Sequence, residues 1–190
     1  MDRMEEMINE PAQRNSVCVF TNLTASEKEM LKECWRSVVG QLIVDDQKVE
    51  DFGKLLLLWL LDNVPNAKKP FKKFDANVTK ASLTKNPVFL NHCRMVGMYL
   101  GQMVELLDKP VELEMLTHQV AINHLSMKPS VGTAYFDPFQ EKFPRFMSET
   151  LQKPLDDPLI KAWDKFLMVL TGKVKKSEKM IAKSQKCAMC

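Results

Sequence analysis

The sequence feature that most constrains the fold is a helical spacing of apolar residues between positions 86 and 110. In the segment NPVFLNHCRMVGMYLGQMVELLDKP, apolar side chains recur at steps of three and four residues: Leu90, Val96, Leu100, Met103, Val104 and Leu107. This spacing places them on one stripe of an α-helix, which other elements must cover. His92 lies on the same stripe, one turn before Val96. A histidine in a core usually does no more than satisfy its own hydrogen bonds, so the rest of the chain decides whether His92 has another role.

Further helices are predicted on both sides of this segment. NLTASEKEMLKECWRSVV predicts a first helix with Thr24 as its N-cap and Glu27 as the reciprocal carboxylate, and Ser26 is a second N-cap candidate. VDDQKVED predicts a charged break, and FGKLLLLWLLDNVP a second, very apolar helix that ends at Pro65. The residues between that proline and position 86 are predicted to be mostly loop. After Pro110 three more helical segments follow, the last ending at Gly172.

These segments predict an all-α protein with one folded domain. Period-two alternation typical of strands is absent, and 190 residues suit a single core with short tails. We therefore predict a flexible N-terminal extension over residues 1–21, the helical domain over residues 22–172, and a basic C-terminal tail over residues 173–190.

Composition limits the classes of function. The net charge is +3, but six lysines and one glutamate between Lys173 and Lys186 carry +5, so the remainder carries about −2. An acidic body argues against nucleic-acid binding. The first thirty residues lack the apolar stretch of a secretory signal, so we expect a cytoplasmic protein with mostly free thiols at its five cysteines. The three histidines are thinly spread along the chain, and a zinc site is not expected.

Several landmarks occur together in the order and at the spacing found in one family. Trp35 stands twelve residues after Leu23, Gly53 lies in the predicted second helix, and Phe71 and Phe74 follow Pro65. His92 comes twenty-one residues after Phe71, and AWDKFL lies in the last predicted helix. Over about 150 residues this pattern resembles the globin family, particularly the divergent invertebrate globins of the nematode kind. The resemblance implies a globin fold of six to eight helices around a haem pocket, in which Gly53 is the small residue at a helix crossing.

The resemblance also implies a cofactor and its neighbours. The cofactor would be haem b, iron protoporphyrin IX. His92 looks like the distal histidine, Val96 the aliphatic wall behind it, Phe71 the ring packed on the porphyrin, and Leu57 the residue that closes the distal pocket. Cys93, one residue after His92, would point away from the iron as a small buried side chain.

Two histidines are candidates for the proximal iron ligand. His124 lies thirty-two residues after His92 and His118 twenty-six after it, whereas the family's usual separation is a little under thirty. His124 requires a small insertion near Asp108–Pro110, and it leaves the aromatic pair Tyr135–Phe136 at about the family's distance. We therefore favour His124 and keep His118 as the alternative. The second ring nitrogen of a metal-bound histidine usually donates to a fixed acceptor, commonly a main-chain carbonyl of the preceding turn.

The function that this resemblance implies is reversible binding of O2 or another diatomic gas. The alternative is a redox or gas-sensing globin in which His92 binds the iron as a sixth ligand. A globin-fold protein that has lost haem and acts only in protein interactions is a third reading. The residues do not separate these readings, nor storage from transport, and they do not fix the oligomeric state.

The C-terminal tail carries a separate prediction. Cys187-Ala188-Met189-Cys190 nominally fits the C-a-a-X prenylation pattern, with lysines just upstream. A lipid chain together with a polybasic stretch would hold the protein at a membrane surface. Terminal Cys is not among the typical final residues of this motif, and a solvated basic tail is the alternative.

Overall fold

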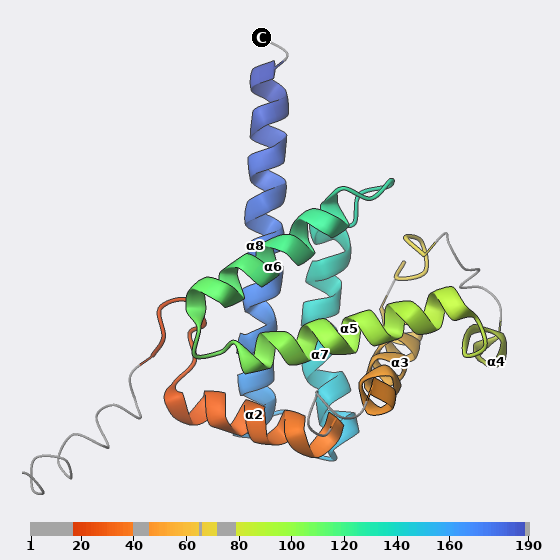
Figure 1. Cartoon of the computed structure of the whole chain (residues 1–190), viewed down its shortest axis with the longest axis vertical. Coiled ribbons are helices and arrows are strands. Elements are labelled where there is room, and N and C mark those ends of the chain that lie inside the picture. The colour runs from red at the N-terminus through yellow and green to blue at the C-terminus, as the bar shows by residue number, and fades with distance from the viewer. Residues whose placement is uncertain (1–16, 40–45, 65, 72–78, 189–190) are drawn as a thin grey trace, which may run out of the picture.

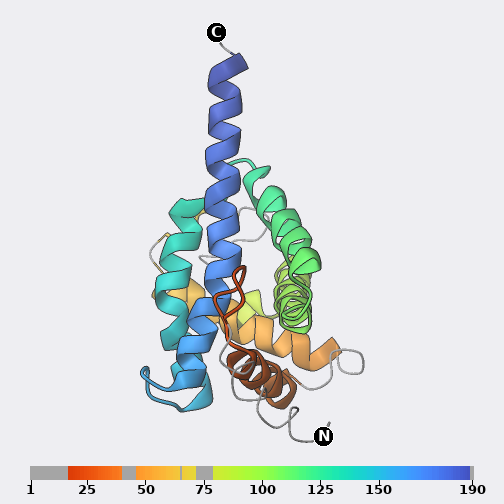
Figure 2. The same cartoon turned by 90° about the vertical axis from the view of Figure 1, so that its left-hand side faces the viewer.

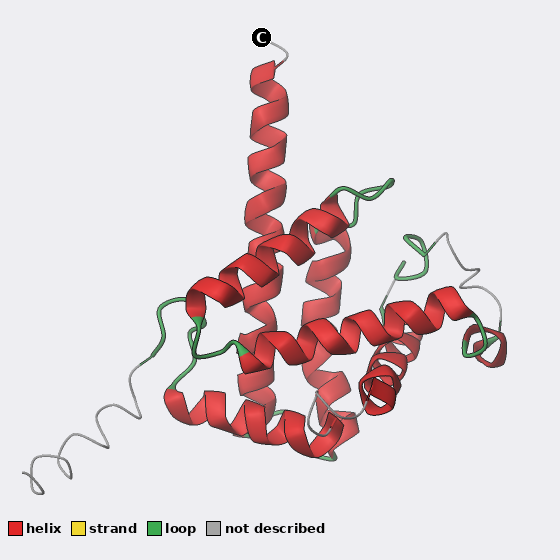
Figure 3. Ribbon diagram, viewed as in Figure 1, coloured by secondary structure: helices red, strands yellow, loops and turns green. Residues whose placement is uncertain are grey.

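The computed structural model describes residues 17–39, 46–64, 66–71 and 79–188. These residues form seven helices and no strand, which confirms the predicted all-α fold. The helices are α2 (Ala25–Val39), α3 (Asp46–Asn63), α4 (Lys80–Leu83), α5 (Pro87–Glu105), α6 (Pro110–Leu125), α7 (Thr133–Leu151) and α8 (Pro158–Ala188). Figure 3 shows them joined by loops. None of the helices in the described part of the chain is both long enough and apolar enough to span a membrane.

Helix α2 begins with the predicted capping box. The main-chain N–H of Thr24 donates to a Glu27 carboxylate oxygen at 2.8 Å, and the Glu27 N–H donates to the Thr24 hydroxyl at 3.2 Å. Each side chain therefore satisfies a donor that the first helical turn leaves without a partner. The other Glu27 oxygen accepts from Lys165 Nζ at 2.6 Å, which joins the start of α2 to α8.

Helix α3 begins earlier than predicted. Most of VDDQKVED is helical rather than a break, because α3 starts at Asp46. Val49 and Phe52 are 2% and 5% exposed, so this charged segment has a buried face of its own. On its outer face Lys54 Nζ lies 3.0 Å from an Asp51 oxygen, a spacing at which opposite charges support a helix.

The predicted end of the last helix at Gly172 is wrong. Helix α8 continues through Gly172 to Ala188. Val174 is fully buried and Ser177 is 4% exposed, so the face that packs against the body continues past the glycine. An interior glycine costs a helix about 1 kcal/mol relative to alanine, which this continued packing outweighs. The first residues of the predicted tail therefore belong to the packed structure.

An aromatic cluster occupies the centre of the core and joins four helices. Trp35 of α2 contacts Phe52 of α3 edge-on, with ring centroids 5.0 Å apart. On α7, Phe146 lies 5.9 Å from Phe52, while Phe143 lies 6.1 Å from Trp163 of α8. Edge-to-face ring pairs of this kind add about 0.5–1.5 kcal/mol each beyond their burial, so the cluster fixes how these helices pack.

Helices α3 and α5 cross in close backbone contact. A methyl group at Gly53 would lie 1.9 Å from the carbonyl oxygen of Cys93, and one at Gly97 would lie 2.3 Å from that of Val49. Neither distance leaves room for a side chain. Glycine on each helix is therefore required for the crossing, as the resemblance implied for Gly53.

The helices form two crossed layers. Figure 1 shows α5 and α6 passing across the α7–α8 pair, with α2 and α3 lying at the lower end of these helices. Helix α8 continues beyond the other helices, and Figure 2, turned by 90°, shows the same projection. The crossed arrangement leaves α5, which carries His92, and α6, which carries His118 and His124, on the same side of the α7–α8 pair.

Candidate functional site

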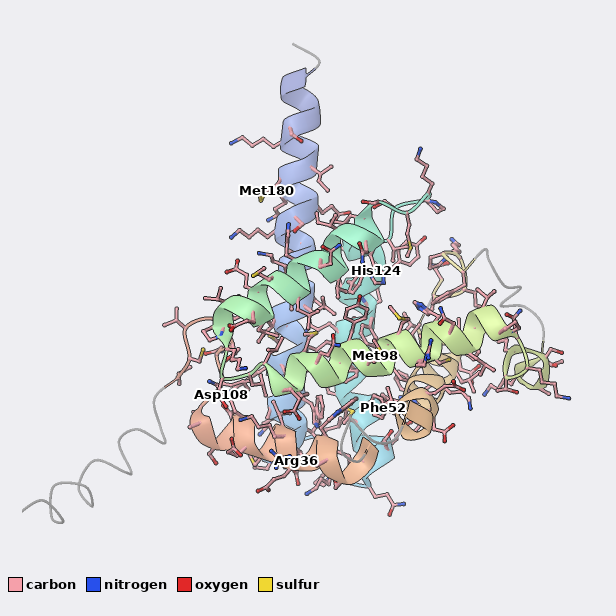
Figure 4. The ribbon with its side chains drawn as sticks, viewed as in Figure 1. Arg36, Phe52, Met98, Asp108, His124 and Met180 are labelled. Carbon is pink, nitrogen blue, oxygen red and sulfur yellow. The ribbon has the colours of Figure 1, made fainter. Side chains whose placement is uncertain are left out.

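His124 lies near the C-terminal end of α6, on the side toward α5 (Figure 4). Its Nδ1 lies 2.8 Å from the main-chain oxygen of Val120, one turn earlier. A carbonyl oxygen can only accept, so Nδ1 must carry the proton and donate it. In the neutral imidazole this leaves a lone pair on Nε2. The acceptor is of the kind predicted from the sequence for a metal-bound histidine.

The His124 ring is neutral and held in place. Burial lowers the pKa of His124, an effect that the hydrogen bond to Val120 partly opposes. The ring also meets Phe136 of α7 edge-on, with centroids 5.2 Å apart and planes at 85°. A main-chain acceptor and an aromatic face together orient Nε2, which is the requirement for a pre-positioned metal ligand.

His92, on α5, is the second imidazole of the site. Burial and, to a smaller extent, the charge of His124 together lower the pKa of His92 to about 4. His92 is therefore neutral at pH 7, and the two imidazoles interact electrostatically. Its ring contacts Phe71 edge-on, with centroids 5.4 Å apart.

The remaining predicted residues form an apolar wall beside His92. Leu57 of α3 is 4% exposed and belongs to a cluster of side chains from α3, α4, α5 and the segment between α3 and α4. Phe71 and Val96 pack against this cluster, and Val96 also borders the main core. The cluster contains Leu57, Leu61, Val64, Ala67, Leu83, Phe89 and Cys93. The structure therefore brings Leu57, Phe71, His92 and Val96 into one neighbourhood.

His118 lies elsewhere. It is an exposed residue of α6, six positions before His124. Six residues rotate a helix by about 240°, so the two side chains leave α6 in different directions. Of the two proximal candidates, only His124 contributes to the lowered pKa of His92.

Cys93 is buried in the wall rather than exposed to reagents. It is 0% exposed and burial raises the pKa of its thiol to about 12. The protonated sulfur packs as a small apolar group, as expected from its place in the sequence. Its carbonyl also lies against Gly53.

Two features of the site were missed by the sequence analysis. Phe136 served there only as a spacing landmark, although its ring packs against His124. Gly97 was not singled out, although it allows α5 to approach α3. The signal for Gly97 was present, because Gly97 and Gly101 lie four apart on a helix whose other residues favour side-chain packing.

Comparison with known proteins identifies the family. The family model for Globin matches residues 54–174, which include His92, His124 and the apolar wall beside His92. The chain belongs to the globin family. The narrower resemblance to globins of the nematode kind stays a prediction.

The related sequences cover nearly the same length. This globin is 24% identical over 156 residues to a globin of Biomphalaria glabrata, covering 82% of this chain and 99% of the relative. It is also 24% identical over 153 residues to cytoglobin-1 of Oryzias latipes, covering 80% of this chain and 82% of that protein. These matches cover at least 80% of the chain rather than a single motif.

Solved globin structures share the fold. Ferric Aplysia limacina myoglobin, determined with azide bound, superposes with a TM-score of 0.63 at 20% identity, covering 82% of this chain and 98% of that one. A hexacoordinated heme protein from an anhydrobiotic tardigrade superposes with a TM-score of 0.66 at 22% identity, covering 81% and 94%. At these identities the likeness concerns the fold.

Proposed function

We propose that this globin holds haem b through His124 and reversibly binds O2. The observation that carries the proposal is the hydrogen bond from His124 Nδ1 to the Val120 carbonyl at 2.8 Å. This hydrogen bond leaves Nε2 with a lone pair that can bind a metal ion, on a neutral imidazole whose orientation is fixed. Because burial lowers the pKa of His124, that lone pair is not lost to a proton at neutral pH.

The neighbouring residues fit the cofactor chemically. Haem iron held by one imidazole offers its opposite coordination position to a diatomic ligand. Neutral His92 keeps one ring N–H, and such a donor stabilises a partly negative ligand by about 1.5–3 kcal/mol. Leu57, Phe71 and Val96 supply apolar surface beside His92, and an apolar surrounding limits the access of water.

A second candidate function is redox or gas-sensing chemistry with His92 as a sixth ligand. The pKa of His92, about 4, leaves its own lone pair unprotonated at neutral pH, so it is as competent a ligand as His124. A protein of similar fold is described as a hexacoordinated heme protein. In this alternative His92 must turn its unprotonated nitrogen, rather than its N–H, toward the iron.

The visible absorption spectrum of the haem-reconstituted protein tests both functions. The protein would be reduced under argon and then exposed to O2. A broad five-coordinate ferrous band that converts reversibly on adding O2 supports oxygen binding. Sharp six-coordinate bands before any gas is added, and lost in His92→Leu, support the alternative. Failure of the full-length protein to take up haem would overturn both.

A further inference from the structure

The C-terminal end of α8 projects from the globin body. Among the described side chains of α8, Ser177, at 4% exposed, is the last that is buried, and those from Lys179 to Ser184 are all exposed. The helix continues to Ala188, eleven residues beyond Ser177, which corresponds to about 16 Å at 1.5 Å per residue. Figures 1 and 4 show this end standing clear of the other helices, with Met180 on the projecting part.

Exposed lysines line α8 from just before Ser177 into the projecting end. Lys175, Lys179 and Lys183 follow one another at four-residue steps, which places them along one face of the helix, and Lys176 borders that face. All four lysines are exposed, and within the described ranges none has a carboxylate oxygen within 4 Å.

The single acidic side chain in this stretch is turned toward the body. Glu178 accepts hydrogen bonds from the Thr133 main-chain N–H at 3.1 Å and from its hydroxyl at 2.6 Å. Because Glu178 caps the start of α7, it is not available to neutralise the lysines. Lys176 lowers the pKa of Glu114 on α6 and so shares part of its charge, whereas Lys175, Lys179 and Lys183 present their charge to solvent.

Apolar surface accompanies the lysines. Met180 is 63% exposed and Ile181 36% exposed. At the base of the projection a shallow cavity of about 210 Å³ is lined by Phe20, Glu114, Met168, Val169, Gly172, Lys173 and Lys176. Lys176 belongs to both the basic face and this cavity, so the apolar and basic surfaces are continuous.

We propose that this end of α8 is a docking surface for an anionic lipid membrane. Exposed lysines beside exposed aliphatic side chains on one helix are typical of helices that lie at a membrane interface. Residues 172–190 contain neither arginine nor an aromatic residue, the side chains that recognise nucleic acids by paired hydrogen bonds and base stacking. A second copy of this helix would bring like charges together. The surface acts without any modification of Cys187, whose side chain lies outside the described residues.

Vesicle co-sedimentation of the full-length, bacterially produced, haem-loaded protein tests the proposal. The expected result is binding to phosphatidylcholine vesicles containing 30% phosphatidylserine, little binding to pure phosphatidylcholine, and loss of binding as salt increases. The variant K176Q/K179Q/K183Q should bind on the order of 100-fold more weakly, because each lysine near such a surface contributes about a factor of five. Met180→Ser with Ile181→Ser should weaken binding and leave its salt dependence in place.

A matched control separates this surface from net charge. K85Q/K128Q/K161Q removes the same charge from exposed lysines of the body and should bind as the parent protein does. Equal weakening in this control would overturn the proposal, as would equal binding to neutral vesicles. Tighter binding to single-stranded RNA than to the anionic vesicles would assign the basic face to nucleic acid instead. Visible and far-ultraviolet spectra of each variant establish that the body is intact.

Discussion

At the scale of single residues, the assignment of His124 as the proximal ligand leads to a direct test. His124→Gly should lower haem affinity by more than about 100-fold, because removing a group that only orients a metal ligand already costs about 10- to 100-fold. Imidazole added to the solution should restore haem binding by supplying the missing nitrogen. The rate of haem transfer to an acceptor globin measures the effect.

The exposed His118 provides the control on the same helix. His118→Ala should retain haem as the parent protein does. If instead His118→Ala lost haem and His124→Gly kept it, the sequence alternative would be correct and the Val120–His124 hydrogen bond would have only a structural role.

A pH prediction follows from His92 in the haem-free protein. Its pKa is about 4 in the folded state against an ordinary value of 6.5, chiefly because burial disfavours the charged ring. The unfolded chain therefore binds a proton between these pH values that the folded chain does not. The free energy of unfolding should be highest above pH 6.5 and decrease toward pH 4, with His92 accounting for about 3 kcal/mol.

Urea unfolding of the apoprotein at several pH values checks this contribution. His92→Leu should lose less stability than the parent between pH 6.5 and pH 4. Both proteins should still lose some stability as the pH falls, because burial also lowers the pKa of His124. Parallel curves for the two proteins would mean that His92 does not titrate in this way.

At this scale the sequence could place the candidate residues on their helices but could not predict their contacts. The stripe that contains His92 and Val96 has a helical period, so the position of both on α5 could be read directly. The choice between His118 and His124 rested on spacing alone, whereas their exposure depends on how α6 is rotated against α5. The edge contact of Phe136 with His124 joins α7 to α6, and no local pattern records such a contact.

At the scale of helices, replacing a crowded glycine and an uncrowded one by alanine should have opposite effects on stability. Gly97→Ala would place a methyl group 2.3 Å from the Val49 carbonyl oxygen, so α3 and α5 must move apart. We expect a loss of about 1–3 kcal/mol in the free energy of unfolding. Gly172→Ala meets nothing within 4 Å and should instead gain up to about 1 kcal/mol from helix propensity.

Urea unfolding of the two variants provides the comparison, since both make the same chemical change inside a helix. An equal effect of the two substitutions would show that close packing at the crossing does not decide the outcome. Because Gly97 lies close to Cys93 and Val96 on α5, Gly97→Ala should also alter the visible spectrum of the haem-loaded protein, whereas Gly172→Ala should not.

The helix boundaries show where local signals were sufficient. The Thr24–Glu27 capping box was predicted correctly, because its two hydrogen bonds are made within four residues. The charged segment before α3 and Gly172 in α8 were both taken as breaks, and both are helical. In each case residues buried against another helix, Val49 in α3 and Val174 in α8, outweigh the local preference.

At the scale of the whole molecule, the chain consists of a globin body and a projecting helix that share one continuous element. The sequence predicted their different charge but placed the boundary at residue 172. Val174, Ser177 and the Glu178–Thr133 hydrogen bonds instead tie the first turns after Gly172 to α6 and α7. The boundary between the globin body and the projecting helix should therefore lie after Glu178.

Two truncations distinguish these boundaries. A chain ending at Glu178 keeps every buried side chain of α8, and its free energy of unfolding should lie within about 0.5 kcal/mol of the full-length value. A chain ending at Gly172 loses the burial of Val174, worth about 1.5–3 kcal/mol, and the cap on α7, worth about 1 kcal/mol. Urea unfolding should therefore show a loss of about 3 kcal/mol for the shorter chain alone.

Both truncations should lose binding to anionic vesicles, so the chain ending at Glu178 should be a stable, haem-binding globin without its membrane-docking surface. Equal stability of the two truncated chains would place the boundary at residue 172 after all.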